Sequence, residues 1–399
     1  MSHPALRARI AEHLQVLAGD IGARPPGSFP NRRAAAYIRG VLADTGMAVR
    51  EHPFRTRWWE PGAGRLAGPH VDTPVTPNPF SRSCDVEGIA LRVTSLAQLN
   101  TLACQPGRIL VLADELTRHP LMPQAFPFAN PREHQRVIDA VSVARPLAVI
   151  TVSDGSEPIL EDPDLPFASA TVSEAIGSAL RTGDLLRLWL GGRVHDGSGV
   201  TVTARTPGSG QRVVVSAHLD SKVTTPGAFD NAGGVAVLLA LAEDRPEAVR
   251  PLELVAFNGE DHFDACGEQA WLAATDLDEV ALNVNLDGVG LLGRDTSLAS
   301  LACPAELEEQ LERFVAGQPG WVRVAPWFES DHAIFAAQGI PAVAITSESA
   351  RALIGTVAHG PYDTVDLVDV DVLAQIAVVV RDLLECLDRE GPLCHHALT

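Results

Sequence analysis

Long apolar segments in the second half of the chain constrain its fold most. They are "QRVVVSAHLD", "PLELVAFNGED", "ALNVNLDGVG" and "IPAVAIT", and helical segments, among them 305–316 and about 370–389, lie between or after them. A strand that is apolar along its whole length is covered on both faces of its sheet, and strands that alternate with helices favour a parallel sheet. We therefore predict an α/β fold for this part of the chain.

The middle of the chain has a different pattern. Between residues 64 and 196, short strand signals such as "GIALRV", "RILVLAD", "PLAVITV" and "DLLRLWLGG" accompany one clear helix, "PREHQRVIDAVSVA". The length of 399 residues also exceeds that of one ordinary domain. We predict a discontinuous domain, residues 1–63 and 197–399, interrupted by a mostly-β insert, residues 64–196.

The N-terminal part reads as two helices followed by an irregular stretch. Residues 3–18 and 31–45 have helical spacing of apolar residues, and Asn31 is placed as an N-cap. Residues 52–83 are rich in proline and keep neither a helical nor a strand period for long, so we expect irregular structure there.

Charge and cysteine content narrow the function. Fifty acidic and 31 basic residues give a formal charge of −19, which disfavours nucleic acid and anionic membranes as partners. No apolar run approaches the roughly 18 residues of a membrane span, and the N-terminus lacks the apolar stretch of a signal peptide. The six cysteines form no CxxC pair, which is typical of reduced thiols. We expect a cytoplasmic protein; the sequence does not specify its oligomeric state.

Acidic and imidazole groups follow three of the predicted strands. His218 and Asp220 come after "VVVSA", Glu260 and Asp261 after "LELVAFNG", and Asp287 ends "ALNVNL". In open α/β sheets, ligands bind beyond the carboxyl ends of the strands. The sequence therefore predicts a polar site at this edge.

Each of these residues also has a simpler explanation. Asp230 or Asn231 can cap the helix that begins near Gly233, and Asp287 can form an Asx turn. Gly233 and Gly234 are poor residues for a helix start, and we expect them to allow close approach of the backbone to a bound group.

Taken together, the set favours a metal centre. Two imidazoles and three carboxylates provide enough ligands for two zinc ions if one carboxylate bridges, and cobalt or manganese also suits such ligands. The ligand candidates are His218, Asp230, Asp261, Asp287 and His359. Glu260 remains next to a ligand, where a general base for metal-activated water belongs.

The motifs resemble one peptidase family. "SAHLDS…PGAFDNAGG", "NGEDHFDACGEQAWL", "NVNLDGVG", "SDHAIFAAQGIPA" and "HGPYDT" occur in the order found in the co-catalytic di-zinc aminopeptidase family of clan MH, and "IGARPPGS" resembles its N-terminal loop. The resemblance implies a three-layer αβα sandwich with a mixed, mostly parallel central sheet, the zinc exopeptidase fold. The insert is similar to a protease-associated domain.

The resemblance also implies roles for individual residues. His218 and Asp287 would hold one zinc ion, Asp261 and His359 the other, and Asp230 would bridge them. Glu260 takes the position of the general base, Asp220 that of a support for His218, and the Asp230–Asn231 peptide bond is a candidate for a cis bond. Asp331, His332 and Tyr362 are candidates for substrate or oxyanion contacts, with Asp363 as a support behind the ligands.

These roles predict a zinc-dependent exopeptidase that acts on peptides, an aminopeptidase whose bridging hydroxide is formed with Glu260 as base. Two departures from the family bear on this prediction: Asp261 stands where glutamate is usual, and Ala358 where several relatives have an oxyanion-binding tyrosine. The alternatives are a carboxypeptidase, for which Arg294 and Arg351 are carboxylate-binding candidates, a glutaminyl cyclase, and a non-catalytic receptor-like protein.

Overall fold

The computed structural model describes residues 1–128, 130–155, 157–245, 250–350 and 357–389. The chain forms two compact units, which consist of residues 1–56 with 198–399 and of residues 57–197. The junctions predicted from the sequence were 63/64 and 196/197. Each unit is described separately below.

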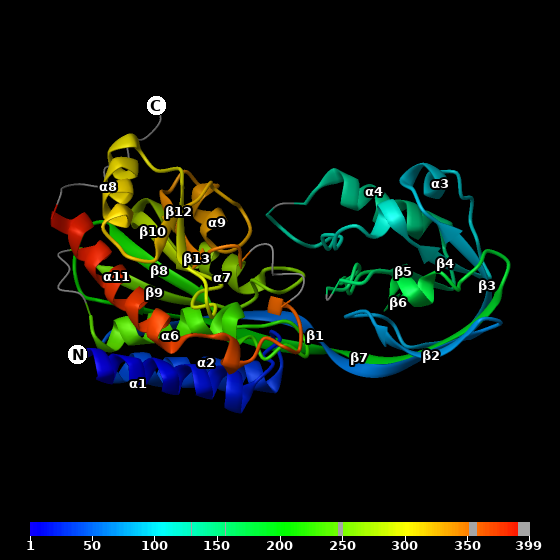
Figure 1. Cartoon of the computed structure of the whole chain (residues 1–399), viewed down its shortest axis with the longest axis horizontal. Coiled ribbons are helices and arrows are strands. Elements are labelled where there is room, and N and C mark those ends of the chain that lie inside the picture. The colour runs from blue at the N-terminus through cyan, green and yellow to red at the C-terminus, as the bar shows by residue number, and fades with distance from the viewer. Residues whose placement is uncertain (129, 156, 246–249, 351–356, 390–399) are drawn as a thin grey trace. The chain divides into compact units, whose positions relative to one another are not determined.

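The first unit is built on a mixed sheet (Figure 1). Its strands, in spatial order, are β7 (Leu185–Arg205), β9 (Leu252–Phe257), β8 (Arg212–His218), β10 (Val280–Leu286), β13 (Ala342–Ser347), β11 (Thr296–Leu301) and β12 (Trp321–Arg323). The central β9, β8, β10 and β13 are parallel. At the two sides of this core, β7 runs antiparallel to β9, and β11 runs antiparallel to β13 but parallel to β12. The predicted mixed, mostly parallel sheet is confirmed.

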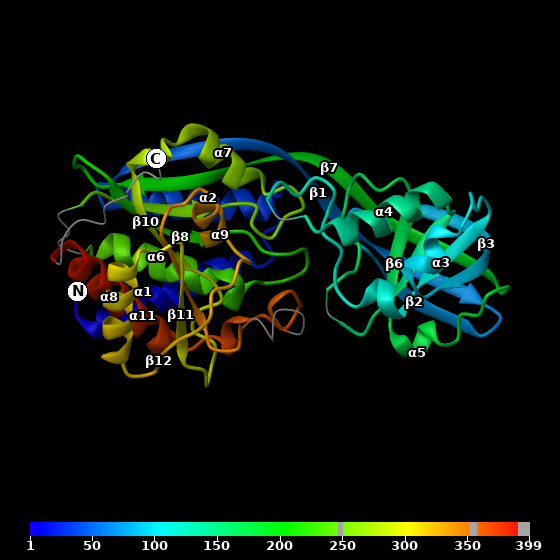
Figure 2. The same ribbon diagram turned by 90° about the horizontal axis from the view of Figure 1, so that it is seen from above.

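Helices cover both faces of this sheet. They are α1 (His3–Leu14), α2 (Phe29–Asp44), α6 (Gly233–Glu243), α7 (Cys266–Ala274), α8 (Ala305–Ala316), α9 (His332–Ala336) and α11 (Val370–Arg389). Successive residues of a strand point to opposite faces, and accordingly Val215 packs in a core with α1, α2, α6 and α11, while Val214 packs in another with Trp271 and Phe335. The first unit therefore has three layers, helices, sheet and helices (Figures 1 and 2).

The second unit is mostly β. Its strands are part of β1 (Ala48–Gly68), β2 (Val71–Pro77), β6 (Ala168–Val172), β5 (Ala148–Val152), β4 (Arg108–Leu112), β3 (Cys84–Val93) and part of β7, with β1 also paired to β7. Its helices are α3 (Leu96–Asn100), α4 (Arg132–Ala144) and α5 (Glu174–Gly177). The assignment of this unit as a protease-associated domain stays a prediction.

Short helical turns complete the described structure. Turns of 3₁₀ type span Asp114–Thr117, Leu277–Glu279 and Val365–Leu367, and turns of π type span Gln15–Ile21 and Ala228–Ala232. In the part of the chain that the structure describes, no helix combines the length and apolarity of a membrane span.

Two local predictions are wrong. Residues 52–83 contain strands, because the segment after Pro61 pairs antiparallel with β2 from Gly64 to Gly68, and its prolines mask the alternation of buried and exposed residues. Asn31 is not the N-cap of α2. Ser28 occupies that position, and its Oγ accepts a hydrogen bond from the Asn31 N–H at 3.2 Å.

Candidate metal centre

Parallel strands bring the predicted site residues to one edge of the sheet. His218 is the last residue of β8 and pairs in register with Phe257, the last residue of β9, so Glu260 and Asp261 follow at the same edge. Asp287 directly follows β10, which pairs with β8 on its other side. Since β9, β8 and β10 end together, their polar residues converge.

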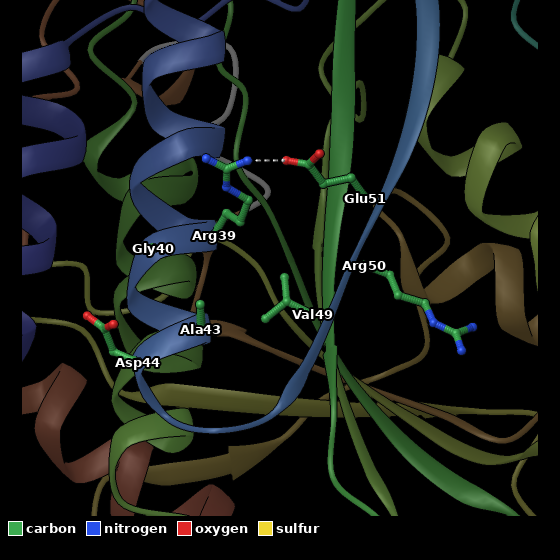
Figure 3. Close-up of a pocket in the computed structure, with 7 residues that line it drawn as sticks. All are labelled: Arg39, Gly40, Ala43, Asp44, Val49, Arg50 and Glu51. Atoms are coloured by element: carbon green, nitrogen blue, oxygen red, sulfur yellow. Dashed lines mark hydrogen bonds and ion pairs between the residues drawn. The ribbon is translucent and has the colours of Figure 1, made fainter.

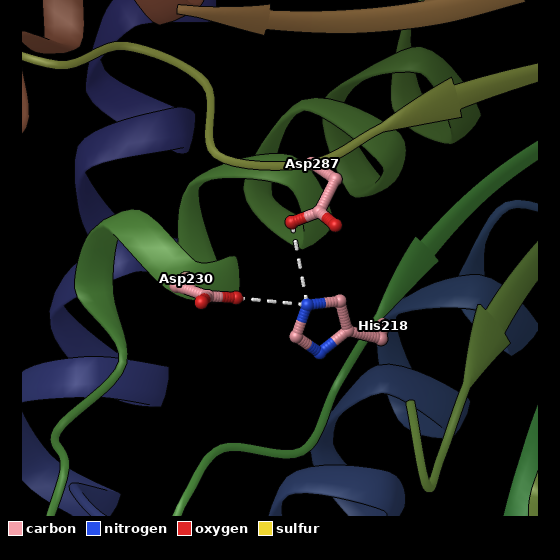
Figure 4. A group of neighbouring side chains, drawn as sticks. All are labelled: His218, Asp230 and Asp287. Carbon is pink, nitrogen blue, oxygen red and sulfur yellow. Dashed lines mark ion pairs between the residues drawn. The ribbon is translucent and has the colours of Figure 1, made fainter. Parts of the chain in front are cut away.

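The first cluster contains His218, Asp230 and Asp287 (Figure 4). The Nε2 atom of His218 lies 2.9 Å from Oδ1 of Asp230 and 3.3 Å from Oδ1 of Asp287. Burial lowers the pKa of His218, but the surrounding carboxylates, Asp287 foremost, outweigh it and raise this pKa well above its usual value. Among the residues that the structure describes, neither of the two buried ring nitrogens of His218 has a hydrogen-bond partner.

The second cluster uses the other oxygen of Asp230. The Nε2 atom of His359 lies 3.0 Å from Oδ2 of Asp230 and 3.1 Å from Oδ1 of Asp261. Burial raises the pKa of Asp261, yet His359 and Lys222 together outweigh burial and lower it. Asp230 thus directs one oxygen toward each imidazole, which is the arrangement of a carboxylate that can bridge two cations.

The donor set suits divalent cations. His218, Glu260 and Asp261 form a third group, and within each of the three groups the candidate ligand atoms lie within 4.8 Å of one another. Buried carboxylates that crowd together require cations or protons, and an orphaned buried imidazole nitrogen requires a partner. The residues present therefore fit a metal centre, which zinc, with its preference for mixed His and carboxylate ligands, would satisfy.

Glu260 and Asp261 behave differently although they are neighbours. Burial and the charges of Asp261, Asp287 and Asp230 raise the pKa of Glu260 well above its usual value, with His218 opposing them. The Glu260 carboxylate lies 4.0 Å from His218 Nε2, and its side chain is 21% exposed, against 5% for Asp261. Glu260 is therefore the member of the pair that reaches solvent.

Two carboxylates support the ligands through the backbone. Asp220 accepts hydrogen bonds from the N–H groups of Gly259, at 2.8 Å, and Asp261, at 3.1 Å. It lies 3.7 Å from His218 Nδ1, too far for a hydrogen bond, so it orients the Glu260 loop more directly than it orients the imidazole. Asp363 accepts from the N–H groups of Phe229, at 2.7 Å, and Asp230, at 3.0 Å, and burial raises its pKa to about 7.

At the start of α6, the residue that caps the helix and the candidate metal ligand are two different residues. Asn231 Oδ1 accepts a hydrogen bond from the Gly234 N–H, and its Nδ2 donates to the Leu286 carbonyl, so Asn231 has the capping role and Asp230 is left to the cluster. The Asp230–Asn231 peptide bond is cis, as the resemblance implies. A Cβ on Gly234 would lie 2.4 Å from Asn231 Oδ1 and 2.5 Å from the Leu286 carbonyl. The glycine is therefore needed because protein atoms lie close to it, and not because a bound group does, as the sequence led us to expect.

The candidates for substrate contacts differ in how deeply they are buried. Asp331 and His332 are buried where α9 begins, and His332 Nε2 contacts the Trp327 carbonyl at 2.9 Å, which occupies one of its two ring nitrogens. Tyr362 is 77% exposed. Arg294 is exposed, and Arg351 lies outside the described residues. The pocket between α2 and β1 in Figure 3 is lined by none of the predicted site residues.

Sequence reasoning missed Arg24, which lies in the quoted segment "IGARPPGS". Its guanidinium is fully buried and donates to the carbonyl groups of Leu17, Leu219, Gly22, Pro226 and Gly227. Burial lowers its pKa to about 10, although the carboxylates of the site oppose this. Arg24 thus fixes the loop between His218 and Asp230, and only its place in a motif, without its partners, was visible in the sequence.

The chain is similar to known proteins in part of its sequence and in its fold. Residues 201–384 match peptidase family M28. Solved structures that resemble the chain include an aminopeptidase from Aneurinibacillus sp. strain AM-1 (TM-score 0.77, 19% identity, 98% of this chain and 96% of that chain). A zinc aminopeptidase from Bacillus subtilis is also similar (TM-score 0.74, 16% identity, 97% of both chains), and these identities show a shared fold.

A curated relative matches a short segment. A vacuolar membrane protease from Clavispora lusitaniae is 36% identical over 84 residues, which are 21% of this chain and 8% of that protein. The chain therefore spans a small part of that relative's length.

Proposed function

Because residues 201–384 of this chain match peptidase family M28, we propose that the protein is a metal-dependent aminopeptidase that removes N-terminal residues from peptides. The observation that carries the proposal is the position of Asp230, whose two oxygens lie 2.9 Å from His218 and 3.0 Å from His359. A shared carboxylate between two such clusters is suited to a pair of zinc ions.

Five residues would hold the two ions. His218 and Asp287 form one side, Asp261 and His359 the other, and Asp230 is common to both. When bound, two divalent cations polarise a scissile carbonyl, lower the pKa of water and offset the charge of a tetrahedral adduct.

Glu260 moves the proton. It lies beside the first cluster, yet it is partly exposed, so it can take a proton from the attacking water molecule and deliver it to the leaving amine. Asp220 keeps this residue in place through the backbone N–H groups on either side of it, those of Gly259 and Asp261.

The acidic surroundings favour a free N-terminus on the substrate. A peptide α-ammonium group finds carboxylates to pair with, whereas a carboxypeptidase needs cations to hold an α-carboxylate. Of the two arginine candidates for that task, the one in the described part of the chain, Arg294, is exposed. The cytoplasmic location expected from the sequence stays a prediction.

The test combines metal analysis with a substrate panel. Protein purified without chelator should contain two zinc ions per chain and hydrolyse amino-acid arylamides and unblocked peptides, but not N-acetylated ones. Glu260→Gln should keep both ions and lose about 10²–10⁴-fold in kcat, the usual contribution of a general base. Release of C-terminal residues from N-acetylated peptides, cyclisation of N-terminal glutamine, or full activity of Glu260→Gln would contradict the proposal.

A further inference from the structure

The chain has a single lysine, and this lysine lies beside the candidate metal centre. Lys222 is the one lysine among the 31 basic residues of the sequence, and all the others are arginines. Its Nζ atom lies 3.9 Å from Oδ1 of Asp261, the oxygen that is 3.1 Å from His359 Nε2. Its side chain is 22% exposed, so the ammonium group lies where the buried carboxylates meet solvent. Neither the motifs nor the proposed mechanism gives this lysine a role.

The turn that carries Lys222 is held at both ends. The Ser221 hydroxyl accepts from the Arg24 N–H and donates to the Thr225 carbonyl, and the Thr225 N–H donates to the Lys222 carbonyl. Thr224 has a φ of 68°, a left-handed conformation that is costly for a β-branched residue and persists where surrounding contacts enforce it. The backbone of Lys222 is therefore fixed, and its flexible four-carbon side chain can move the ammonium group within a small region beside the centre.

The carboxylate next to Lys222 has a second use. Asp261 is a candidate metal ligand, so in the metal-loaded protein the charge of its carboxylate is taken up by a cation. An ammonium group that is largely removed from water is unfavourable without an anion close to it. Lys222 is therefore placed to pair with an anion that arrives with the substrate.

Two kinds of peptide carry such an anion near the bond that is cleaved. In the proposed function the scissile carbonyl lies at the metal centre, so groups a few covalent bonds away from this carbonyl come near Lys222. A carboxylate is that close in peptides that begin with aspartate or glutamate, through the side chain, and in dipeptides, through the C-terminus. Both kinds keep the free α-amino group that an aminopeptidase requires.

The rest of the protein opposes the binding of these peptides. The formal charge of −19 and the carboxylates of Asp230, Glu260 and Asp287 repel a second carboxylate on the substrate. An ammonium group at the edge of the site offsets this repulsion where the substrate carboxylate would lie. A single lysine at this position can thus decide whether anionic peptides are accepted.

We propose that Lys222 binds a substrate carboxylate close to the scissile bond and gives the enzyme a preference for peptides that carry one there. This inference rests on the proposed aminopeptidase function and adds a class of substrate to it.

Kinetics of the zinc-loaded protein on two pairs of substrates test the inference. Glutamyl and glutaminyl arylamides differ in the side-chain carboxylate, and alanyl-alanine and its C-terminal amide differ in the C-terminal carboxylate. Wild-type protein should hydrolyse the charged member of at least one pair with the higher kcat/KM, and that pair identifies the source of the carboxylate. Lys222→Gln should lower the ratio of kcat/KM between the charged and the uncharged member of this pair about tenfold. Lys222→Arg, which keeps the charge, is the matched control and should keep most of the ratio.

The single lysine also allows a test that does not depend on activity. In zinc-loaded Glu260→Gln, acetic anhydride should label Lys222 several-fold more slowly when the charged peptide of the preferred pair is bound than when its uncharged partner is bound. Mass spectrometry of the peptide that contains Lys222 measures the difference. The N-terminal amine of Met1, which lies beside Asp244, is the internal control and should be labelled equally in both samples.

The remaining outcomes separate this inference from the proposed function. Faster hydrolysis of the uncharged member of both pairs by wild type, ratios that Lys222→Gln leaves unchanged, or equal labelling of Lys222 in both samples would overturn the inference. A zinc-loaded wild-type protein that hydrolyses none of the four substrates would instead contradict the proposed function. Each ratio compares two substrates of one variant, so a general loss of activity or zinc does not alter it, and unfolding midpoints show whether each variant has folded.

Discussion

The side-chain amides of Asn31 and Asn258 donate hydrogen bonds to each other, at 2.8 and 3.0 Å, in a fully buried position. Asn31 lies in the first turn of α2, and Asn258 precedes Glu260 by two residues. Asn31 also donates to the Arg24 carbonyl, and Asn258 to the Val200 carbonyl. This pair fastens the N-terminal helix to the loop that carries Glu260.

We expect Asn31→Ala and Asn258→Ala each to lower the free energy of unfolding by about 1–3 kcal/mol, because each leaves a buried amide without its partner. The double variant should lose less than the sum of the two, since its second substitution removes an amide that has already lost the other amide of the pair. Urea denaturation of the four proteins measures the coupling. Strictly additive losses would show that the two amides do not act as a pair.

Gly227 has to remain glycine for Asp230 to keep its place. Its φ is 64°, and a Cβ there would lie 2.5 Å from the Asp230 carbonyl. Gly227→Ala should therefore displace the backbone of Asp230, lower the zinc content and reduce stability by more than the roughly 1 kcal/mol of left-handed strain alone. Gly46→Ala is the matched control, because its φ is 75° and no atom lies within 4 Å of the added Cβ. Equal losses in the two variants would contradict the steric argument.

Glu268 makes stability depend on pH. It is 1% exposed, its carboxylate oxygens have no hydrogen-bond partner within the described structure, and burial, with the charge of Asp220, raises its pKa from 4.5 to about 8. Its protonated form is favoured in the folded state. Its contribution to stability is therefore complete below pH 4.5 and is lost as pH rises through 8.

Glu268→Gln should remove this dependence. The variant should gain stability relative to wild type as pH rises from 5.5 to 8, by up to about 1.4 kcal/mol per pH unit, because glutamine cannot ionise. Urea unfolding of both zinc-loaded proteins at pH 5.5, 7 and 8.5 measures the difference. Glu306→Gln, at an exposed position of α8, is the control and should show a constant difference. A constant difference for Glu268→Gln as well would contradict the assigned pKa.

The sequence allowed prediction where one local pattern has one structural solution. The strands before His218 and Asp287 are apolar throughout, which indicates that both faces of their sheet are covered. Parallel strands end at the same edge of a sheet, so the sequence predicted that His218 and Asp287 lie close together. The strand in the proline-rich part of β1 could not be predicted, because the prolines hide the local strand pattern and the strand is defined by its pairing with β2. The pairing of Asn31 with Asn258 joins residues 227 positions apart, and no local pattern encodes it.

Asp363 is not a candidate metal ligand, but it fixes the backbone of the ligand Asp230 and should therefore affect zinc affinity. Its two oxygens accept the N–H groups of Phe229 and Asp230, one each. In Asp363→Asn one of these oxygens becomes an NH₂ donor that faces an N–H group, so we expect Asp230 to shift and zinc affinity to fall about 10–100-fold, the usual cost of losing a group that orients a ligand. Asp366→Asn, at an exposed position nearby, is the matched control. Equilibrium dialysis measures both variants, and an unchanged Kd in Asp363→Asn would show that the cis-linked Asp230 holds its position without this carboxylate.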